Sequence, residues 1–285
     1  MNSYDPIALL SKCSSPTEQV IRAQSHTKDR CDLLASLLYL RHNQMQIRFY
    51  KNVEDKMTDS LALTSVAEGI VQLQLPLPFA LRIVNVYLLR GEKGWTIIDC
   101  GINTPAGRDT WLAAFKQLGV TPADIEKIVL THTHPDHFGL SGWLQNLAAE
   151  AGRTVPIYVS PIENEQVRLV WRDEASMDFG GWMRINGMPD EMARDVDSSM
   201  DDTRAMTLPH PPCLELLHPG DTVQLGERHF QIMEGQGHSD GHLLFYDAQD
   251  QLMLSGDHVL MKITPNIGLW TQTAPDPLGR FITSL

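Results

Sequence analysis

Apolar residues recur along the chain in two different periods, at every second position in some stretches and at helical spacing in others. IVNVYLLR, the turn GEKG and WTIIDCG predict two antiparallel strands joined by a tight turn within residues 83–101. PAGRDTWLAAFKQLG (105–119) keeps its large apolar residues on one face and lies between a proline and a glycine, which predicts a helix. The succession of strand-like and helix-like segments indicates a mixed α/β (α+β) domain.

The same succession continues towards the C-terminus with one interruption. A short buried strand, KIVLT, precedes a predicted helix over residues 136–151 and the strand VPIYVS. Residues 160–208 then break the rhythm with ENEQVRLVWRDEA, a Gly-Gly pair and an acidic stretch, so we interpret them as a helical insertion that lies over the domain. Strands resume with CLELLH, TVQLG, HFQIMEG, HLLFYD and LMLSGD, which are separated by turn sequences.

The charge balance divides the chain near residue 57. Basic residues outnumber acidic ones over 1–56, whereas acidic residues dominate the remainder. We therefore expect an N-terminal appendage over 1–56, with one helix at 29–42, and a second domain over 57–285. No sequence feature indicates a role for the appendage or an oligomeric state.

The overall composition limits the class of protein. A chain of 285 residues with 42% apolar residues buries a sizeable core, which excludes global disorder. The net charge of −12 disfavours nucleic acid as a partner and favours a small-molecule substrate. Four cysteines without paired spacing indicate reduced thiols, and the first residues resemble neither a signal peptide nor a membrane span, so we expect a cytoplasmic protein without membrane contact.

LTHTHPDHFG, which follows the predicted strand KIVLT, has the residue types of a metal site. His132 and His134 point to the same side of an extended segment because side chains alternate with a period of two. The proline after them fits the first turn of a helix, which places Asp136 and His137 beside the same point. The aspartate offsets the positive end of the helix dipole. A lone H-x-H pair is weak evidence, but the full HxHxDH pattern predicts a metal centre.

Two later loops supply further ligands. EGQGHSDGH places His238 between glycines directly after a strand, and LMLSGDHVL ends another strand with Asp257. We expect both side chains to complete the site, and we expect the second histidine of the glycine-rich loop, His242, to support the ligands without binding metal. Asp99, at the end of a strand in IIDCG, fits either a supporting role beside the ligands or the cap of a turn.

The order of strand, HxHxDH and helix, then Gly-His-Ser-x-Gly-His, then a strand ending in Gly-Asp resembles the metallo-β-lactamase superfamily from about Ile70 onward. GDHVLMKITPNIGLW and IIDCG are most similar to its glyoxalase-II-like branch, which is related to hydroxyacylglutathione hydrolases. The resemblance implies an αββα sandwich with two metals, normally zinc, at one edge of the sheets. It further implies that the ligands of the first metal are His132, His134 and His238 and that two ligands of the second are Asp136 and His137. In the same resemblance Asp257 is the bridging carboxylate and Asp99 is a supporting aspartate.

The pattern departs from the family at its end. The family normally supplies one more histidine for the second metal in a loop well after the bridging aspartate. His258 directly follows Asp257, where neighbouring side chains face opposite sides, and no further histidine precedes Leu285. PDPLGRFITSL is typical of the start of a helix without a C-cap, so we interpret the chain as truncated, with an incomplete second half of the sandwich. A chain without that histidine also fits a catalytically incomplete protein that binds or senses metal.

The ligand set predicts a hydrolase. Histidine and aspartate ligands without cysteine suit Zn²⁺, and such sets tolerate Fe²⁺ or Mn²⁺. A zinc-dependent metallo-hydrolase would use a metal-bound hydroxide on a small acyl substrate such as a thioester or lactone, with Asp136 orienting the nucleophile. A phosphodiesterase or nuclease on the same fold is an alternative that the acidic composition disfavours. We expect the insertion to select the substrate, and five of its residues fit either the wall of an apolar pocket or the packing face of a helix: Trp171, Phe179, Trp182, Met183 and Met188.

Overall fold

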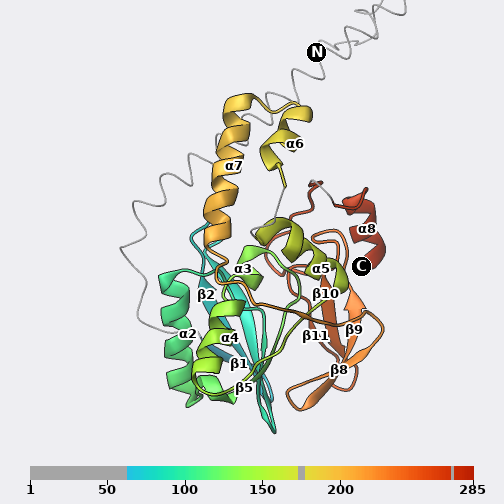
Figure 1. Cartoon of the computed structure of the whole chain (residues 1–285). Coiled ribbons are helices and arrows are strands. Elements are labelled where there is room, and N and C mark those ends of the chain that lie inside the picture. The colour runs from blue at the N-terminus through green and yellow to red at the C-terminus, as the bar shows by residue number, and fades with distance from the viewer. Residues whose placement is uncertain (1–62, 173–176, 271–272) are drawn as a thin grey trace, which may run out of the picture.

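The computed structural model describes residues 63–172, 177–270 and 273–285, in which two β-sheets pack against each other (Figure 1). The first sheet has the strand order β1-β2-β3-β4-β5-β6-β7, and the second has the order β11-β10-β9-β8. The strands are β1 Leu63–Ala67, β2 Ile70–Pro76, β3 Ile83–Gly91, β4 Gly94–Ile98, β5 Ile125–Val129, β6 Ile157–Val159, β7 Glu215–Leu216, β8 Thr222–Leu225, β9 Arg228–Glu234, β10 Leu243–Asp247 and β11 Leu252–Leu254. The appendage predicted over 1–56, with its helix, lies outside the described residues.

The direction of each strand follows from its connection. Short turns join the consecutive strands from β1 to β4, and each of these strands pairs antiparallel with the next. In the β3–β4 hairpin, which the sequence predicts, Tyr87 lies opposite Ile98. Helical connections precede β5, β6 and β7, each of which pairs parallel with the strand before it. The second sheet is antiparallel throughout. Because β4 and β5 are parallel, their carboxyl ends open at the same edge of the first sheet.

Helices occupy the connections between strands. The helix predicted at 105–119 is α2. Thr104 caps its start, because the Thr104 hydroxyl accepts from the Gly107 N–H, and Gly119 caps its end with a φ of 66°. Within the described residues, no helix is long and apolar enough to cross a membrane. The helices are α2 Pro105–Leu118, α3 Pro135–Phe138, α4 Ser141–Glu150, α5 Pro161–Gln166, α6 Phe179–Ile185, α7 Asp190–Ala205 and α8 Pro277–Ser284, with a π-helical turn at Val167–Trp171.

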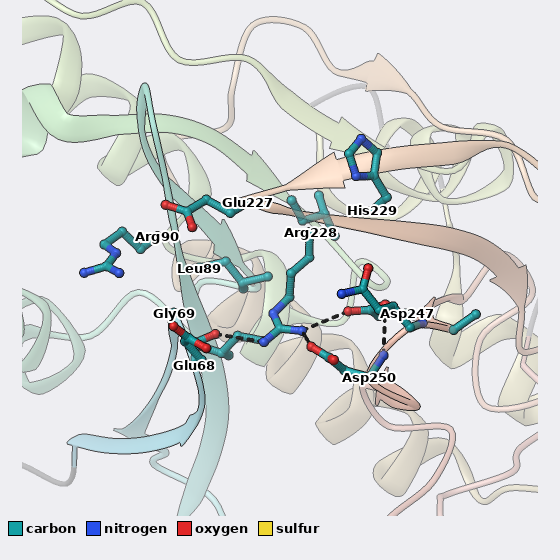
Figure 2. Close-up of a pocket in the computed structure, with 13 residues that line it drawn as sticks. Glu68, Gly69, Leu89, Arg90, Glu227, Arg228, His229, Asp247 and Asp250 are labelled. Carbon is teal, nitrogen blue, oxygen red and sulfur yellow. Dashed lines mark hydrogen bonds and ion pairs between the residues drawn. The ribbon is translucent and has the colours of Figure 1, made fainter.

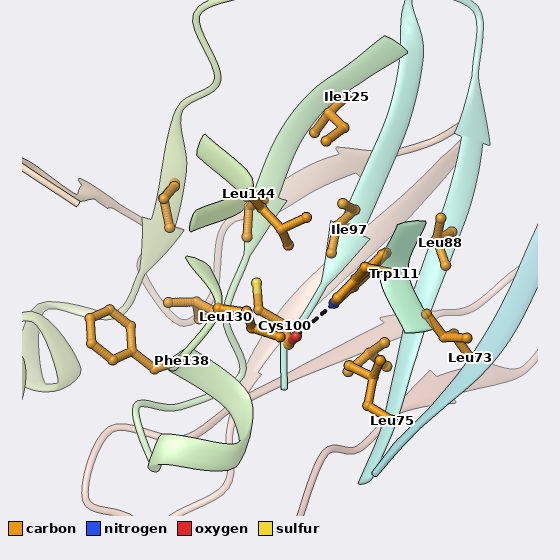
Figure 3. Close-up of a cluster of buried hydrophobic side chains, with 14 of the residues drawn as sticks. Leu73, Leu75, Leu88, Ile97, Cys100, Trp111, Ile125, Leu130, Phe138 and Leu144 are labelled. Atoms are coloured by element: carbon orange, nitrogen blue, oxygen red, sulfur yellow. Dashed lines mark hydrogen bonds between the residues drawn. The ribbon is translucent and has the colours of Figure 1, made fainter. Parts of the chain in front are cut away.

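The larger core lies between the first sheet and the helices α2 and α4 (Figure 3). Leu88 and Ile97 project from adjacent strands towards Trp111 of α2, and Leu144 of α4 packs in the same cluster. Trp111 is fully buried, and its indole N–H donates to the Cys100 carbonyl at 2.9 Å. This bond satisfies the one polar group of the side chain and ties α2 to the end of β4.

The smaller core lies between the two sheets. Leu89, Ile98 and Val129 of the first sheet face Phe230 and Phe245 of the second. These residues alternate with the helix-facing ones along each strand, because successive side chains of a strand point to opposite faces. The central strands of the first sheet are therefore apolar on both faces, as expected for strands covered on two sides.

The single helix predicted over 136–151 is wrong, because the structure has two helices, α3 and α4. The Cys100 N–H donates to the His137 carbonyl at 2.7 Å, and the Leu140 N–H donates to the Gly101 carbonyl at 2.9 Å. The loop after β4 thus binds backbone groups that an uninterrupted helix would pair internally. This break holds the short helix α3 against the end of β4.

The two ends of the sandwich carry different chemistry. At one end, Arg228 donates to the carboxylates of Asp247 and Asp250 and to the Glu68 carbonyl, which joins three turns of the two sheets (Figure 2). These groups line a polar cavity of about 410 Å³. The segments that follow β4, β5, β9 and β11 lie at the opposite end and contain the histidines and aspartates of the predicted metal centre.

Candidate metal centre

Three histidine nitrogens converge at this end of the sandwich. His132 Nε2 lies 3.0 Å from His134 Nδ1 and 3.2 Å from His238 Nε2. His132 and His134 belong to the loop after β5, and His238 belongs to the loop after β9, so the two sheets bring the residues together. Tetrahedral zinc with Zn–N bonds of 2.0–2.1 Å places its ligand nitrogens about 3.3 Å apart. The two separations from His132 Nε2 are close to that spacing.

The other ring nitrogens fix which atoms of these histidines carry lone pairs. His132 Nδ1 lies 3.0 Å from the Thr131 hydroxyl, which itself donates to Asp99 Oδ2, so the ring donates from Nδ1. His238 Nδ1 lies 2.9 Å from the Asn266 carbonyl, which can only accept, so this ring also donates from Nδ1. Burial lowers the pKa of both rings, which keeps them neutral.

Two lone pairs therefore face each other across 3.2 Å, from His132 Nε2 and His238 Nε2. No proton is left to join them, because each neutral ring already donates from its other nitrogen. A cation between the rings removes this repulsion, and three neutral imidazoles are a donor set that suits Zn²⁺. The residues present thus fit a bound metal ion.

A second group of converging atoms contains His132, His137 and Asp257. His137 Nδ1 donates to Asp99 Oδ2 at 2.8 Å, whereas His137 Nε2 is buried and has no hydrogen-bond partner among the described residues. Burial alone would lower the pKa of His137, but the carboxylates of Asp99, Asp136 and Asp257 outweigh it and raise this pKa well above its usual value. The Nε2 atom thus lies where carboxylates favour a positive charge.

Asp257 lies between the two groups. Its Oδ1 is 3.4 Å from His137 Nε2, and its Oδ2 is 3.6 Å from His238 Nε2. Burial alone would raise the pKa of Asp257, but the neighbouring His137 outweighs it and holds this pKa well below its usual value. One carboxylate oxygen faces each histidine, which is the arrangement that the resemblance implies for a bridging aspartate.

Asp136 lies at the edge of the site. Its Oδ2 is 3.7 Å from His137 Nε2, but it belongs to neither group of converging atoms among the described residues. Burial raises the pKa of Asp136. The structure thus brings Asp136 beside the predicted second ligand group without placing it as closely as Asp257.

Asp99 holds the loop that contains the first histidines. Its Oδ1 accepts from the Thr131 N–H, and its Oδ2 accepts from the Thr131 hydroxyl and from His137 Nδ1, all at 2.8 Å. Asp99 has a φ of 60°, an uncommon conformation for a residue other than glycine, and such conformations cluster at functional sites. The helix that follows is capped by Thr104 and not by Asp99, and a supporting role of Asp99 beside the metal ligands stays a prediction.

His242 contacts the site without joining either group. Its ring stacks on that of His132 with centroids 4.7 Å apart, and its Nε2 accepts from the Asp257 N–H at 3.2 Å. Because Nε2 accepts this bond, it is directed at the backbone of Asp257. The supporting role of His242 stays a prediction.

Glu163 is a site residue that the sequence analysis missed. Its Oε2 accepts from the Thr133 N–H at 2.9 Å and from the Thr133 hydroxyl at 2.5 Å. Its Oε1 accepts from the Gly241 N–H at 3.1 Å and from the Ser239 hydroxyl. The buried carboxylate of α5 thus joins the loop of His134 to the loop of His238.

A cavity of about 230 Å³ opens beside His134 and His238. Trp171 and Phe179 of the predicted insertion line it. For these two residues this agrees with the first interpretation, the wall of an apolar pocket. The other three residues named with them do not line this cavity: Trp182, Met183 and Met188. They lie on α6 or the turn after it, where the helix meets α7 instead.

An αββα sandwich with groups of histidine and aspartate at one end of its sheets is typical of one superfamily of metal-binding proteins. The family profile described as the Metallo-beta-lactamase superfamily matches residues 80–284, and the chain belongs to this superfamily. The probable metallo-hydrolase YqjP of Bacillus subtilis is 26% identical over 203 residues, which are 70% of this chain and 60% of that protein. The acyl-coenzyme A thioesterase MBLAC2 of Gallus gallus is 24% identical over 178 residues, or 61% of this chain and 57% of that protein.

The chain thus spans about 60% of the length of these curated relatives. Two solved structures share its fold. A metallo-beta-lactamase family protein from Thermus thermophilus has a TM-score of 0.68 and 30% identity, covering 77% of this chain and 69% of its own. A beta-lactamase domain protein from Burkholderia ambifaria has a TM-score of 0.67 and 28% identity, covering 82% and 68%.

Proposed function

We propose that this protein is a zinc-dependent hydrolase with two metal sites that cleaves a small acyl ester or thioester. The observation that carries the proposal is the pair of facing lone pairs on His132 and His238, which a cation between them would stabilise. The first site would use His132, His134 and His238, and the second would use His137 with Asp136 and the bridging Asp257. Fe²⁺ or Mn²⁺ would fit the same donor set.

Bound Zn²⁺ lowers the pKa of water to about 7 and polarises a carbonyl oxygen. The protein's own residues position the reaction. Asp136, whose pKa burial raises, is the group that we expect to orient the attacking water and to accept its proton at Oδ2. Asp99 and His242 would hold the ligands in place through His137, Thr131 and the backbone of Asp257.

A thioester is our leading substrate class. The sequence resemblance to the glyoxalase-II-like branch supports it, as does the distant relation to an acyl-coenzyme A thioesterase. A lactone or another small ester presents the same carbonyl chemistry. A phosphodiesterase or nuclease is a weaker candidate, because the cavity beside His134 and His238 is lined by no Lys or Arg among the described residues.

The test is hydrolysis of an acetyl thioester by the zinc-loaded protein. We expect turnover in the parent protein and a loss of at least about 100-fold in Asp136→Ala or His134→Ala. His229→Ala removes an exposed histidine at the far end of the sandwich, and we expect it to keep the parent activity. Unchanged turnover in a zinc-loaded Asp136→Ala protein would refute the role of Asp136.

The second candidate is a metal-binding or sensing protein without hydrolase activity. The observation that favours it is the sparse second site, in which only His132, His137 and Asp257 converge among the described residues. This candidate predicts that the protein binds zinc and releases no thiol from any acyl thioester. The hydrolase proposal predicts both zinc binding and thiol release.

A further inference from the structure

The cavity beside His134 and His238 separates the predicted metal ligands from the insertion. It is lined by these histidines and by residues of the segment after α5, of α7 and of the loop before α8. Its volume of about 230 Å³ corresponds to about eight groups the size of a water molecule at ~30 Å³ each. A methylene group is of similar size, so the cavity accommodates a chain of about eight carbons.

Apolar side chains make up much of the walls. Trp171 and Phe179 are buried, and Val170, Met177 and Met200 are partly buried beside them. Their side chains offer methyl, thioether and aromatic surface. A ligand group in contact with them gains free energy by leaving water, and gains more with each apolar carbon that it buries.

The charged groups at the cavity have partners within the protein. Glu163 accepts four hydrogen bonds from the two ligand loops. Asp240 accepts from Arg280 at 2.5 Å and from the Ala274 N–H at 2.8 Å. In the part of the chain that the structure describes, neither Lys nor Arg lines the cavity. A carboxylate placed against these walls, away from the predicted metal ligands, would lose its water without meeting a Lys or Arg among the described residues.

The wall is fixed to the predicted metal site. The indole N–H of Trp171 donates to the Thr133 carbonyl, between His132 and His134, at 2.8 Å. Arg204 of α7 donates to the Val170 carbonyl at 2.8 Å, which joins the second wall to the first. These two bonds hold the wall at a fixed place beside the predicted ligand loop.

We propose that this cavity binds the hydrocarbon chain of an uncharged, unbranched acyl group of up to about eight carbons, with the carbonyl group at His134 and His238. The inference deepens the proposed hydrolase function and rests on it for the identity of the reaction. The cavity selects the acyl part of the substrate by length and by the absence of charge.

The test uses thioesters of one common thiol with acetyl, butanoyl, hexanoyl, octanoyl and dodecanoyl groups. We expect kcat/KM to rise about fourfold for each added methylene up to octanoyl and to rise no further at dodecanoyl. A succinyl thioester has the length of the butanoyl compound but carries a carboxylate, and we expect it to react at least about tenfold more slowly. A flat series, or a faster succinyl compound, overturns the proposal.

A matched pair of variants locates the effect. Met200→Phe adds bulk inside the cavity, and we expect it to lower the ratio of octanoyl to acetyl kcat/KM by about tenfold. Met253→Phe makes the same change at an exposed position of the second sheet, and the ratio should stay at the parent value. An unchanged ratio in Met200→Phe contradicts the assignment of the cavity.

Binding without reaction separates this inference from the hydrolase proposal. Trp171 and Trp270 line the cavity, so tryptophan fluorescence can report the binding of octanamide, acetamide and succinamate to the zinc-loaded protein. We expect octanamide to bind at least about tenfold more tightly than either of the others. If no thioester is cleaved but octanamide binds in this way, the hydrolase proposal fails and the acyl cavity stands. Equal binding of octanamide and acetamide overturns the acyl cavity.

Discussion

Glu163 is the residue whose substitution tests the architecture of the site most sharply. Glu163→Gln keeps the size of the side chain but replaces one carboxylate oxygen with an NH₂ group. Each oxygen of Glu163 accepts from one backbone N–H and one hydroxyl. The hydroxyl of Thr133 or Ser239 can turn to accept from the new NH₂ group, but the backbone N–H beside it cannot.

The substitution therefore leaves one buried backbone N–H, of Thr133 or Gly241, without an acceptor. Such a group costs about 1–3 kcal/mol, and the loss of charge on the remaining bonds adds about 1 kcal/mol. We expect the free energy of unfolding to fall by about 2–4 kcal/mol. Because Glu163 joins the loops of His134 and His238, we also expect zinc affinity at the first site to fall by about 10–100-fold.

Thermal unfolding and zinc titration check these expectations. A loss of 2–4 kcal/mol lowers Tm by roughly 5–15 °C for a domain of this size. Glu165→Gln is the matched control, because Glu165 lies on the same helix but is exposed. Its carboxylate accepts from the Arg168 guanidinium and joins none of the ligand loops in the described part of the chain. Surface substitutions of this kind change stability by less than about 0.5 kcal/mol. If Glu163→Gln matched Glu165→Gln in both Tm and zinc affinity, the reasoning would be refuted.

Three further predictions concern residues around the site and the two ends of the fold. Asp99→Asn removes the acceptor of the His137 Nδ1 proton, so we expect zinc affinity at the second site to fall by about 10–100-fold in a competitive chelator titration. Hydrogen bonds from Arg228 and the backbone outweigh burial and lower the pKa of Asp247 in the folded protein. The ionised Asp247 therefore stabilises the fold above the pKa that it has in the unfolded chain, and this stabilisation is lost as pH falls through its lower pKa in the folded protein. Asp247→Asn should therefore lower the free energy of unfolding by about 2 kcal/mol at pH 7 and by less at pH 3, measured with urea. Trp111→Ala should cost about 3–5 kcal/mol in the same assay, because the indole is fully buried.

Each of these predictions has an outcome that contradicts it. Unaltered second-site affinity in Asp99→Asn would mean that Asp99 does not set the tautomer of His137. A stability difference for Asp247→Asn that grows towards low pH would reverse the predicted sign. A Trp111→Ala protein within about 1 kcal/mol of the parent would contradict the packing of the larger core.

The elements of the fold that depend on local chemistry could be predicted from the sequence. Alternating apolar residues indicate the β3–β4 hairpin, and the proline and glycine at the ends of 105–119 delimit α2. The break between α3 and α4 could not be predicted in this way. It depends on hydrogen bonds from the loop after β4, including Cys100 N–H to the His137 carbonyl, and those form only in the folded chain.

The residues of the candidate site likewise divide into those that a local sequence pattern marks and those that it does not. HxHxDH is a local pattern, so its histidines and Asp136 could be named before the structure was known. Glu163 could not, because Ser160, Pro161 and a glutamate three positions after the serine are typical of a helix N-terminus, and this alone explains the residue. Asn266 contacts His238 through its backbone carbonyl, which any residue type would supply, so no sequence pattern marks it.

The central claim is that the facing nitrogens of this site hold zinc, and the zinc content of the purified protein tests it most directly. Metal is removed with a chelator, zinc is restored in excess, and the bound zinc is counted after gel filtration. The account predicts two equivalents in the parent protein and one in His137→Ala, in which the ligands of the first site remain. A parent protein that binds no zinc contradicts the account.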